Sequence, residues 1–416
     1  MLIDFQQTDV AVLGAGIVGV SAGIAVRQRG FSVTVIDRRE PGSETSYGNA
    51  GVLSSGSILP LNKPSLWRAL PSYLGNTSAA LRWDPLWVMR NLDWVARFLR
   101  HAVASQTKPR AVALHGLIDA SLKLHRDWIV KAGASERIRE TGWLKAWRSD
   151  AIEAAKAEQA FLAEFGIESQ LLDRQAISAL EPNILPVYKV GLLHTQTASV
   201  DSPGGVVKAY AQMLRGLGGT IHQSDVKAIE PLADGWRVVL GDGAIEAHHV
   251  VVALGPWSAD ILRPLGYRVP LASERGYHQE FAPNPARRLQ RPIHDAEGSF
   301  LMTPMENGIR ITSGVELTDR DAPSSFAQLD MVVPLARGVV EFGEAVGEVW
   351  RGARPTLPDS LPMIGPAPRH AGLWCAFGNQ HIGFTTGPAT GDAIAAMIAG
   401  EKPSFDATAF APGRYI

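Results

Sequence analysis

The sequence predicts a mixed α/β fold with two domains, one built on a parallel sheet and the other on a mainly antiparallel sheet. Residues 9–37 show the pattern of strand, helix and strand: "DVAVLGAG", an apolar helix over residues 17–29, and "SVTVID". Far downstream, residues 299–317 contain an Asn-Gly turn at 307–308 between two strand-like runs, the signal of an antiparallel hairpin. With 416 residues, 46% of them hydrophobic, the chain is long enough for two domains.

The next elements along the chain indicate a helical excursion. Residues 59–104 are rich in tryptophan and leucine with Pro and Gly breaks, and a helical pattern continues through "LHGLIDASLKLHRDWIV". A further helix is expected over residues 202–218, with Ser202 as N-cap and Pro203 in the first turn.

The last elements indicate a return to the first domain. Alternating runs around a "GDG" turn at residues 236–254 predict a hairpin that feeds a buried strand. Residues 265–314 are expected to form an antiparallel sheet. The closing stretch, "GLWCAFGNQHIGFTTGPATGDAIAAMIAG", has the pattern of strand, Gly-rich loop and helix, with Pro388 near the helix start and Gly400 after its end.

Composition excludes several classes of protein. The 40 Lys plus Arg balance 41 Asp plus Glu, so no net field favours nucleic acid. The single cysteine, Cys375, excludes an intramolecular disulfide, a Cys-rich metal site and an iron–sulfur cluster, and it fits a reducing compartment. The chain starts without a signal-peptide pattern and has no apolar run of the roughly eighteen residues that span a bilayer. We therefore expect a cytoplasmic protein with no metal and no nucleic-acid partner.

A nucleotide-binding motif lies at the first turn. Gly14, Gly16 and Gly19 form GxGxxG directly after an apolar strand, at the start of a helix. Gly14 permits the tight turn, Gly16 lets the backbone approach a pyrophosphate, and Gly19 lets helix and strand pack closely. Asp37, at the end of the next strand, is placed to accept hydrogen bonds from a ribose. A glycine-rich turn that binds nothing is the alternative, and the motif does not separate NAD from FAD.

Two distant segments favour FAD. A flavin ring extends well beyond the pyrophosphate and needs backbone from other parts of the chain, and both residues 250–258 and residues 378–391 are strand-to-glycine turns suited to close approach. The closing helix is expected to direct its N-terminus into the site, where its dipole stabilises the negative charge of reduced flavin near N1 and the C2 carbonyl.

The motifs together resemble a known family. "VLGAGIVG", "VIDRREPGSETSYGNAGVLS", "VVVALGPWS", "GARPTLPDSLPMIG" and "GNQHIGFTTGPATGDAIAAMI" resemble the D-amino-acid oxidase-like family of FAD-dependent oxidoreductases, and "SYGNAGVLS" with "WDPLWVMRNLDWVARFL" is most similar to its bacterial D-amino acid dehydrogenases. The resemblance covers nearly the full length and is vague over residues 135–189. It implies a Rossmann-type FAD-binding domain and a substrate or cap domain. The expected ranges are 1–60, 190–260 and 350–416 for the first, and 61–189 and 261–349 for the second.

The resemblance also implies a set of cofactor-binding residues. In the loop after the second strand, Glu44, Thr45 and Ser46 would complete the pyrophosphate and ribose shell, while Asn49, Ala50 and Gly51 would pass along the isoalloxazine edge. The full set expected to bind FAD is Gly14, Gly16, Ile17, Val18, Gly19, Asp37, Arg38, Arg39, Glu44, Thr45, Ser46, Asn49, Ala50, Gly51, Val52, Leu53, Val226, Ala253, Gly255, Trp257, Gly378, His381, Ile382, Gly383 and Thr385.

Three residues are implied as catalytic or substrate-binding. Arg354 matches the family's arginine that holds a substrate carboxylate, a task that suits a planar guanidinium; pairing with Asp359 or with a backbone carbonyl is the structural alternative. Tyr277 matches a tyrosine beside the same carboxylate, or is a half-buried strand residue. His381 could contact flavin or substrate, or only nearby backbone. Because the loop after Arg354 lacks the attaching cysteine of some relatives, non-covalent FAD is expected, with Cys375 a buried small residue.

The resemblance implies oxidation of an α-amino acid, in the D form, to an imino acid that hydrolyses to a 2-oxo acid and ammonia. The Cα hydrogen would face flavin N5 and leave as hydride. Oxidation of glycine, sarcosine, hydroxyproline or another secondary amine is an alternative, as is a flavin-binding subunit of a hetero-oligomeric dehydrogenase. A bare NAD-binding protein is the weakest competitor. A quinone is one candidate electron acceptor.

The tryptophan-rich residues 59–104 have two interpretations. They could form an apolar surface that meets a membrane or a quinone, giving peripheral contact at the inner face of the membrane. Packing against the flavin domain is preferred, because Arg68, Arg82, Arg90 and Arg97 interrupt every apolar run.

Overall fold

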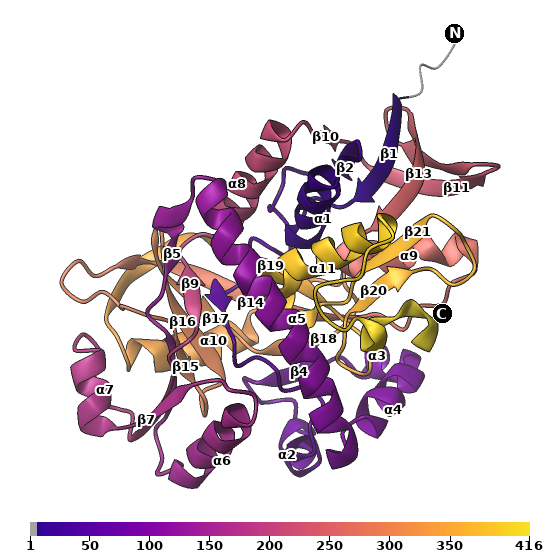
Figure 1. Cartoon of the computed structure of the whole chain (residues 1–416). Coiled ribbons are helices and arrows are strands. Elements are labelled where there is room, and N and C mark those ends of the chain that lie inside the picture. The colour runs from indigo at the N-terminus through magenta and orange to yellow at the C-terminus, as the bar shows by residue number, and fades with distance from the viewer. Residues whose placement is uncertain (1–5) are drawn as a thin grey trace.

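Two large sheets and one small sheet form the framework of residues 6–416, the part of the chain that the computed structural model describes (Figure 1). Residues 1–5 of the expected FAD-binding domain lie outside this part. The strands of the first sheet are β1 (Gln6–Leu13), β2 (Val33–Asp37), β10 (Thr220–Gln223), β11 (Val226–Leu232), β12 (Gly235–Leu240), β13 (Ala244–Val252), β20 (Met363–Pro366) and β21 (Leu373–Phe377). Their order is β10-β2-β1-β13-β12-β11, and β21 joins β13 and β20.

The parallel core of this sheet confirms the predicted strand, helix and strand. β10, β2, β1 and β13 pair in parallel, and α1 (Ile17–Gln28) connects β1 to β2. α8 (Pro203–Gly216) packs on α1 and begins at Ser202, whose Oγ accepts a hydrogen bond from the Gly205 amide at 3.3 Å, as expected of the N-cap. β21 pairs in parallel with β13, so the end of the chain returns to its beginning, seen in Figure 1 as yellow beside indigo.

The second sheet is mainly antiparallel, as predicted. Its strands are β4 (Leu81–Trp83), β6 (Trp143–Trp147), β7 (Ser169–Asp173), β8 (Val190–His194), β14 (Ala272–Pro283), β15 (Ile293–Asp295), β16 (Phe300–Met305), β17 (Gly308–Thr312), β18 (Val315–Leu317) and β19 (Phe342–Thr356). The order is β4-β18-β14-β17-β16-β15-β6-β8-β7, and the long strand β19 pairs with β14. A small sheet joins β3 (Val52–Leu53), β9 (Ala198–Val200) and β5 (Ile138–Arg139).

Both predicted hairpins are present, one with a shifted turn. β12 and β13 pair antiparallel around the "GDG" turn. In the other hairpin Met305 lies opposite Gly308, so the turn is Glu306-Asn307 and the predicted position at 307–308 was wrong by one residue. A Cβ at Gly308 would lie 2.0 Å from the Phe281 carbonyl oxygen. The glycine is therefore needed for the close approach of β14 rather than for the turn.

Two strands cross the expected domain ranges. β8 begins at Val190, inside the range expected for the FAD-binding domain, but it pairs with β6 and β7 of the second sheet. β19 continues in the second sheet to Thr356, beyond the expected boundary at residue 350. Both shifts have one cause: strand pairing between distant segments decides which sheet a strand joins, and sequence patterns alone do not show that pairing.

The remaining helices include the predicted excursion. They are α2 (Ser65–Tyr73), α3 (Pro85–Arg90), α4 (Leu92–Arg100), α5 (Ala104–Lys131), α6 (Ile152–Ala163), α7 (Arg174–Leu180), α9 (Ser258–Leu262) and α10 (Ala327–Arg337). Trp87 and Trp94 are buried together, whereas Trp67 is 50% exposed. Across residues 6–416, no helix is both long enough and apolar enough to cross a membrane.

The closing helix begins earlier than the sequence indicated. α11 (Gly383–Ile398) contains Pro388 in its interior rather than near its start. Proline has no amide hydrogen, so it leaves the carbonyl of Phe384, four residues earlier, without its helical donor. Nε2–H of the buried His125 on α5 donates to that oxygen at 2.8 Å. The imidazole therefore replaces the missing hydrogen bond, and the helix continues past the proline.

Candidate cofactor and substrate site

One elongated cavity lies between the carboxyl ends of the parallel strands and the face of the second sheet. Its walls include Gly14 after β1, Asp37 at the end of β2, Ala253 after β13 and Gly378 after β21, together with parts of β14, β17 and β19. This edge of a parallel sheet is where doubly wound folds bind nucleotides. All of the predicted site residues line this cavity except Gly19, Arg39, Ala50, Gly51, Val52, Leu53, Ile382 and Thr385.

The glycine turn is shaped by close backbone contacts. Gly14 has φ +106°, and a Cβ there would lie 2.4 Å from the Ala253 carbonyl oxygen. A Cβ at Gly19 would lie 1.8 Å from the Gly14 carbonyl oxygen, so Gly19 serves helix packing behind the cavity. Gly16 caps α1, and the next amide, Ile17 N–H, donates to Ser46 Oγ at 3.0 Å. The positive end of the helix therefore faces the cavity.

Asp37 is held by backbone amides. Its Oδ2 accepts from the Ala15 amide at 2.7 Å and its Oδ1 from the Arg39 amide at 3.0 Å. Burial raises the pKa of Asp37, partly offset by these hydrogen bonds. Arg39 turns away from the cavity and, with Arg38, pairs with Glu44 at 3.1 and 2.9 Å.

Trp257 lies between two guanidinium groups at the same end of the cavity. The guanidinium carbon of Arg38 is 4.3 Å from the Trp257 ring centre, and that of Arg320 is 5.3 Å away. Arg320 also pairs with Asp260 at 2.7 Å. Arg320 was missed by the sequence analysis, because it comes from a loop next to the second sheet that no motif marks.

The loop after β2 is fastened from the second sheet. Arg310 on β17 is buried, pairs with Glu280 at 2.6 Å, and donates to the carbonyl oxygens of Tyr47 at 2.8 Å and Asn49 at 2.5 Å. Arg310 was likewise missed, because nothing in its strand pattern distinguishes it. Gly51 lies behind this loop with φ +72°, where a Cβ would be 2.4 Å from a backbone oxygen of β9.

The closing loop brings His381 to the other end of the cavity. Gly378, His381 and Gly383 line the wall, while Ile382 is buried behind it and Thr385 Oγ donates to the Val52 carbonyl at 3.1 Å. The start of α11 thus faces the cavity. The His381 side chain is exposed at the cavity wall, and desolvation by the surrounding protein, reinforced by the nearby Arg354 charge, lowers its pKa to about 4, so its imidazole is neutral at pH 7.

Arg354 lies at this end of the cavity, where the Glu274 carboxyl is its acidic neighbour but forms no salt bridge with it. It pairs with Glu274 in the strand register, and its guanidinium covers Gly276, where a Cβ would lie 2.4 Å from Nη2. Within residues 6–416, Arg354 Nη1 donates one long hydrogen bond of 3.4 Å to the Gly314 carbonyl oxygen. No Asp or Glu among these residues forms an ion pair with Arg354. Burial lowers the pKa of Arg354, yet a guanidinium stays charged. Burial also raises the pKa of Glu274 to about 7.

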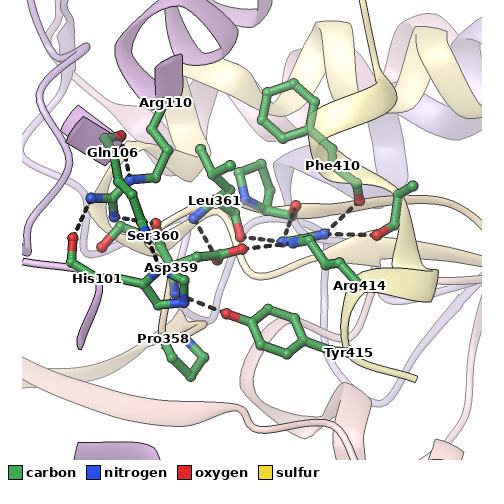
Figure 2. Close-up of polar contacts among 12 residues, drawn as sticks. His101, Gln106, Arg110, Pro358, Asp359, Ser360, Leu361, Phe410, Arg414 and Tyr415 are labelled. Atoms are coloured by element: carbon green, nitrogen blue, oxygen red, sulfur yellow. Dashed lines mark hydrogen bonds and ion pairs between the residues drawn. The ribbon is translucent and has the colours of Figure 1, made fainter. Parts of the chain in front are cut away.

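Asp359, the alternative partner of Arg354, is engaged elsewhere. Its Oδ2 accepts from Arg414 Nε at 2.7 Å, and its amide donates to the Tyr415 hydroxyl at 3.0 Å. Figure 2 shows Arg414 and Tyr415 gathered around the loop that carries Asp359. The pairing of Arg354 with Asp359 was therefore wrong, whereas the other form of the structural alternative, a hydrogen bond to a backbone carbonyl, is present as the contact with Gly314 at 3.4 Å.

Tyr277 is not brought together with Arg354. Its register partner is Arg351, three residues from Arg354, so the two side chains leave the sheet on opposite faces. The Tyr277 hydroxyl accepts from Arg275 and lies 2.5 Å from Glu316. It borders the cavity where β14 passes, but its polar atom belongs to this network on the far face.

The face that carries Arg354 also includes residues that the sequence analysis missed. Gly276, Gly352, Trp350 and Thr312 line the cavity here, and the Thr312 hydroxyl oxygen is buried without a partner in the described part of the chain. Glycines inside strands are a known signal of close approach, so Gly276 and Gly352 could have been noticed.

These walls fit FAD. Glycines and a helix N-terminus at one end match a pyrophosphate, since backbone amides and the helix dipole bind anions without a basic side chain. The cavity continues from there to the closing loop and the start of α11, where Gly378, His381 and Gly383 form its wall. Cys375 is buried on β21 and is not part of the wall.

Comparisons with known proteins agree with this geometry. The sequence profile of the DAO family, described as FAD dependent oxidoreductase, matches residues 9–397. The chain is 28% identical to D-amino-acid oxidase of Bradyrhizobium diazoefficiens and 31% identical to D-amino acid dehydrogenase of Sinorhizobium medicae, covering 98% of this chain and 99% of each relative. The structure superimposes on glycine oxidase from Geobacillus kaustophilus with a TM-score of 0.76 at 20% identity, covering 99% of this chain and 100% of that one.

A second solved structure shows the same fold. L-proline dehydrogenase from P. horikoshii superimposes with a TM-score of 0.77 at 17% identity, covering 99% of this chain and 98% of that one. The profile match over nearly the whole chain and the nucleotide-binding cavity lead to one assignment. This chain belongs to the DAO family of FAD-dependent oxidoreductases.

Proposed function

We propose that this chain oxidises a D-α-amino acid to the imino acid, which water hydrolyses to a 2-oxo acid and ammonia. The observation that carries the proposal is Arg354, a guanidinium on the cavity wall next to the closing loop that forms no salt bridge in residues 6–416 and has the Glu274 carboxyl as its acidic neighbour. A guanidinium at a cavity wall with no salt bridge of its own is suited to a ligand that brings a carboxylate. The relatives named D-amino-acid oxidase and D-amino acid dehydrogenase support an amino acid of the D form.

Arg354 would bind the carboxylate with two parallel hydrogen bonds and so hold Cα in a fixed orientation. Bound FAD supplies the acceptor for the two electrons and the hydrogen that leave Cα. The lone pair of a neutral substrate amine forms the C=N bond as the hydride leaves Cα. The resulting iminium then gives one N–H proton to water. No protein base at Cα is needed, in keeping with the low pKa of His381 at about 4, which leaves a neutral imidazole as a hydrogen-bonding group.

Glycine or a secondary amine is the second candidate substrate. The structural likeness to glycine oxidase and to L-proline dehydrogenase shows that this fold serves both kinds of enzyme. Arg354 would serve equally well, since all of these substrates have a carboxylate. A hetero-oligomeric dehydrogenase subunit and a quinone acceptor are further possibilities that the same experiment addresses.

Anaerobic flavin reduction tests the proposal. The purified yellow protein is mixed anaerobically with D- and L-amino acids, glycine, sarcosine and proline, and the loss of the flavin's visible absorbance is recorded. We expect bleaching by D-amino acids. If only glycine or secondary amines bleach the flavin, the second candidate substrate class is correct and the D-amino acid proposal is wrong. If none of the compounds bleaches the flavin, the result supports a subunit that needs a partner. Oxygen uptake beside dye reduction then separates an oxidase from a dehydrogenase.

A further inference from the structure

Trp350 forms the wall directly beside the carboxylate site. It lies on β19 four residues before Arg354, on the same face of the strand, and it lines the cavity. Its ring stacks on His278 of β14, with ring centres 5.0 Å apart and planes at 14°. An indole supported in this way has little freedom to turn aside.

Two glycines make room for the indole. A Cβ at Gly352 would lie 1.8 Å from Trp350 Cη2, and a Cβ at Gly48 would lie 1.8 Å from Cζ3. Any other residue at either position would displace the ring. The indole therefore lies flat over Gly352 on one side and over the loop after β2 on the other.

The guanidinium and the indole are close neighbours. Gly276, which lies under the guanidinium of Arg354, is the direct register partner of Gly352, which lies under the indole. Directly opposed residues of antiparallel strands have Cα atoms only about 4.5–5.5 Å apart. The guanidinium and the indole therefore cover directly opposed positions of the two strands.

We infer that Trp350 is a specificity-determining residue that restricts the size of the substrate side chain; this rests on the proposed function. A substrate whose carboxylate binds Arg354 places Cβ within a few ångströms of the guanidinium, so a longer side chain on the indole side meets the ring. Gly276 and Gly352 make room for the guanidinium and the indole themselves. Trp350 excludes long substrate side chains by steric contact and takes no part in the reaction.

The experiment compares the ratio of kcat/KM for D-alanine and D-leucine in the holoenzyme and three variants. The wild type should favour D-alanine by about tenfold or more, since a single misplaced methylene in a pocket changes this ratio by roughly 10–200-fold. Trp350→Ala should shift the ratio toward D-leucine by about tenfold or more. Trp350→Phe should give a smaller shift in the same direction. Trp67→Ala is the matched control, because Trp67 lies on α2, half exposed and outside the cavity wall, and its ratio should not change.

The outcomes separate the inference from the proposed function. If D-amino acids bleach the flavin but the wild type favours D-leucine, or the ratio is the same in Trp350→Ala, only the inference is overturned. If no amino acid bleaches the wild type, the proposed function fails and the inference fails with it. Should Trp350→Ala not fold, the wild-type ratio and Trp350→Phe still decide the matter.

Discussion

The two ends of the cavity are constructed differently. At the pyrophosphate end, Gly14, Gly16 and Asp37 come from one continuous stretch of strand, helix and strand, and each lies where the local motif predicts. At the substrate end, Arg354 and Trp350 come from β19 and meet residues of β14 and β17 that are distant in the sequence. The first end depends on local geometry, whereas the second depends on strand register.

The difference shows how each end can fail. A local motif is disrupted by a single residue that alters the backbone, and ligand binding is lost. A registered sheet face keeps its shape when one side chain is shortened, so a substitution there removes only that side chain's contribution. The predictions below run from the largest expected effect to the smallest and test this contrast.

Gly14→Val should abolish FAD binding. Its backbone has φ +106°, and the added Cβ would meet the Ala253 carbonyl at 2.4 Å, so the turn that faces the pyrophosphate cannot keep its form. The flavin absorbance per mole of purified protein measures the loss. Gly30→Val is the control, because Gly30 also has positive φ, +89°, but no atom within 4 Å of its Cβ position. Full flavin content in Gly14→Val would remove this turn from the cofactor site.

Arg310→Met should destabilise the protein by roughly 3–5 kcal/mol, because it leaves the buried Glu280 without its cation. It should also weaken FAD binding, since the carbonyls of Tyr47 and Asn49 lose their donor. Urea denaturation and a flavin fluorescence titration measure the two effects.

The double variant Arg310→Met/Glu280→Met separates the effect on stability from the effect on FAD binding. Replacing both charges should restore much of the stability but not the affinity for FAD. If affinity returns together with stability, Arg310 does not position the loop after β2.

Arg354→Ala should lower kcat/KM by about tenfold to 150-fold, the equivalent of 1.5–3 kcal/mol for a hydrogen bond to a charged group. FAD content should remain, because the pyrophosphate end is unaffected. A fall of less than about tenfold, roughly 1.4 kcal/mol, would contradict the assignment of Arg354 to the carboxylate.

Tyr277→Phe provides the contrast on the opposite face of the same strand pair. Its hydroxyl interacts with Arg275 and Glu316, so we expect a loss of about 1 kcal/mol in stability and little change in KM. Thermal melting and steady-state kinetics measure the two. A large rise in KM with unchanged stability would return Tyr277 to the substrate site.

Glu274→Gln should change how stability depends on pH. Burial raises the pKa of Glu274 from 4.5 to about 7, so the folded state binds more protons than the unfolded state between these values. The ionisation of Glu274 therefore lowers the free energy of unfolding as pH rises from about 5 to 7. A glutamine does not ionise, so the variant does not show this decrease. Relative to wild type, the variant should gain on the order of 2 kcal/mol between pH 5 and pH 8. Equal urea midpoint differences at the two pH values would contradict the shifted pKa.

The fold was largely predictable from pattern, because period and turn signals are local. The first strand, helix and strand, the helix capped by Ser202 and both hairpins were confirmed. The predicted start of α11 near Pro388 was wrong, because His125 of α5 supplies the hydrogen bond that the proline removes and the helix begins earlier. No local pattern shows this contact. The range expected for the FAD-binding domain began at residue 190 and so included β8, but β8 pairs with β6 and β7 of the second sheet, a pairing that no local pattern shows.

The sequence by itself determined the glycine turn, Asp37 and the presence of a cavity at the carboxyl ends of parallel strands, since these follow from backbone geometry within a few dozen residues. Only the tertiary structure decided that Arg354 lacks Asp359 as partner, that Tyr277 faces away, and that Trp350 lies on the same strand face as Arg354. Register sets which face a strand residue occupies, and a shift of one residue reverses it. Register is set by the pairing of β14 with β19, which lie far apart in the chain.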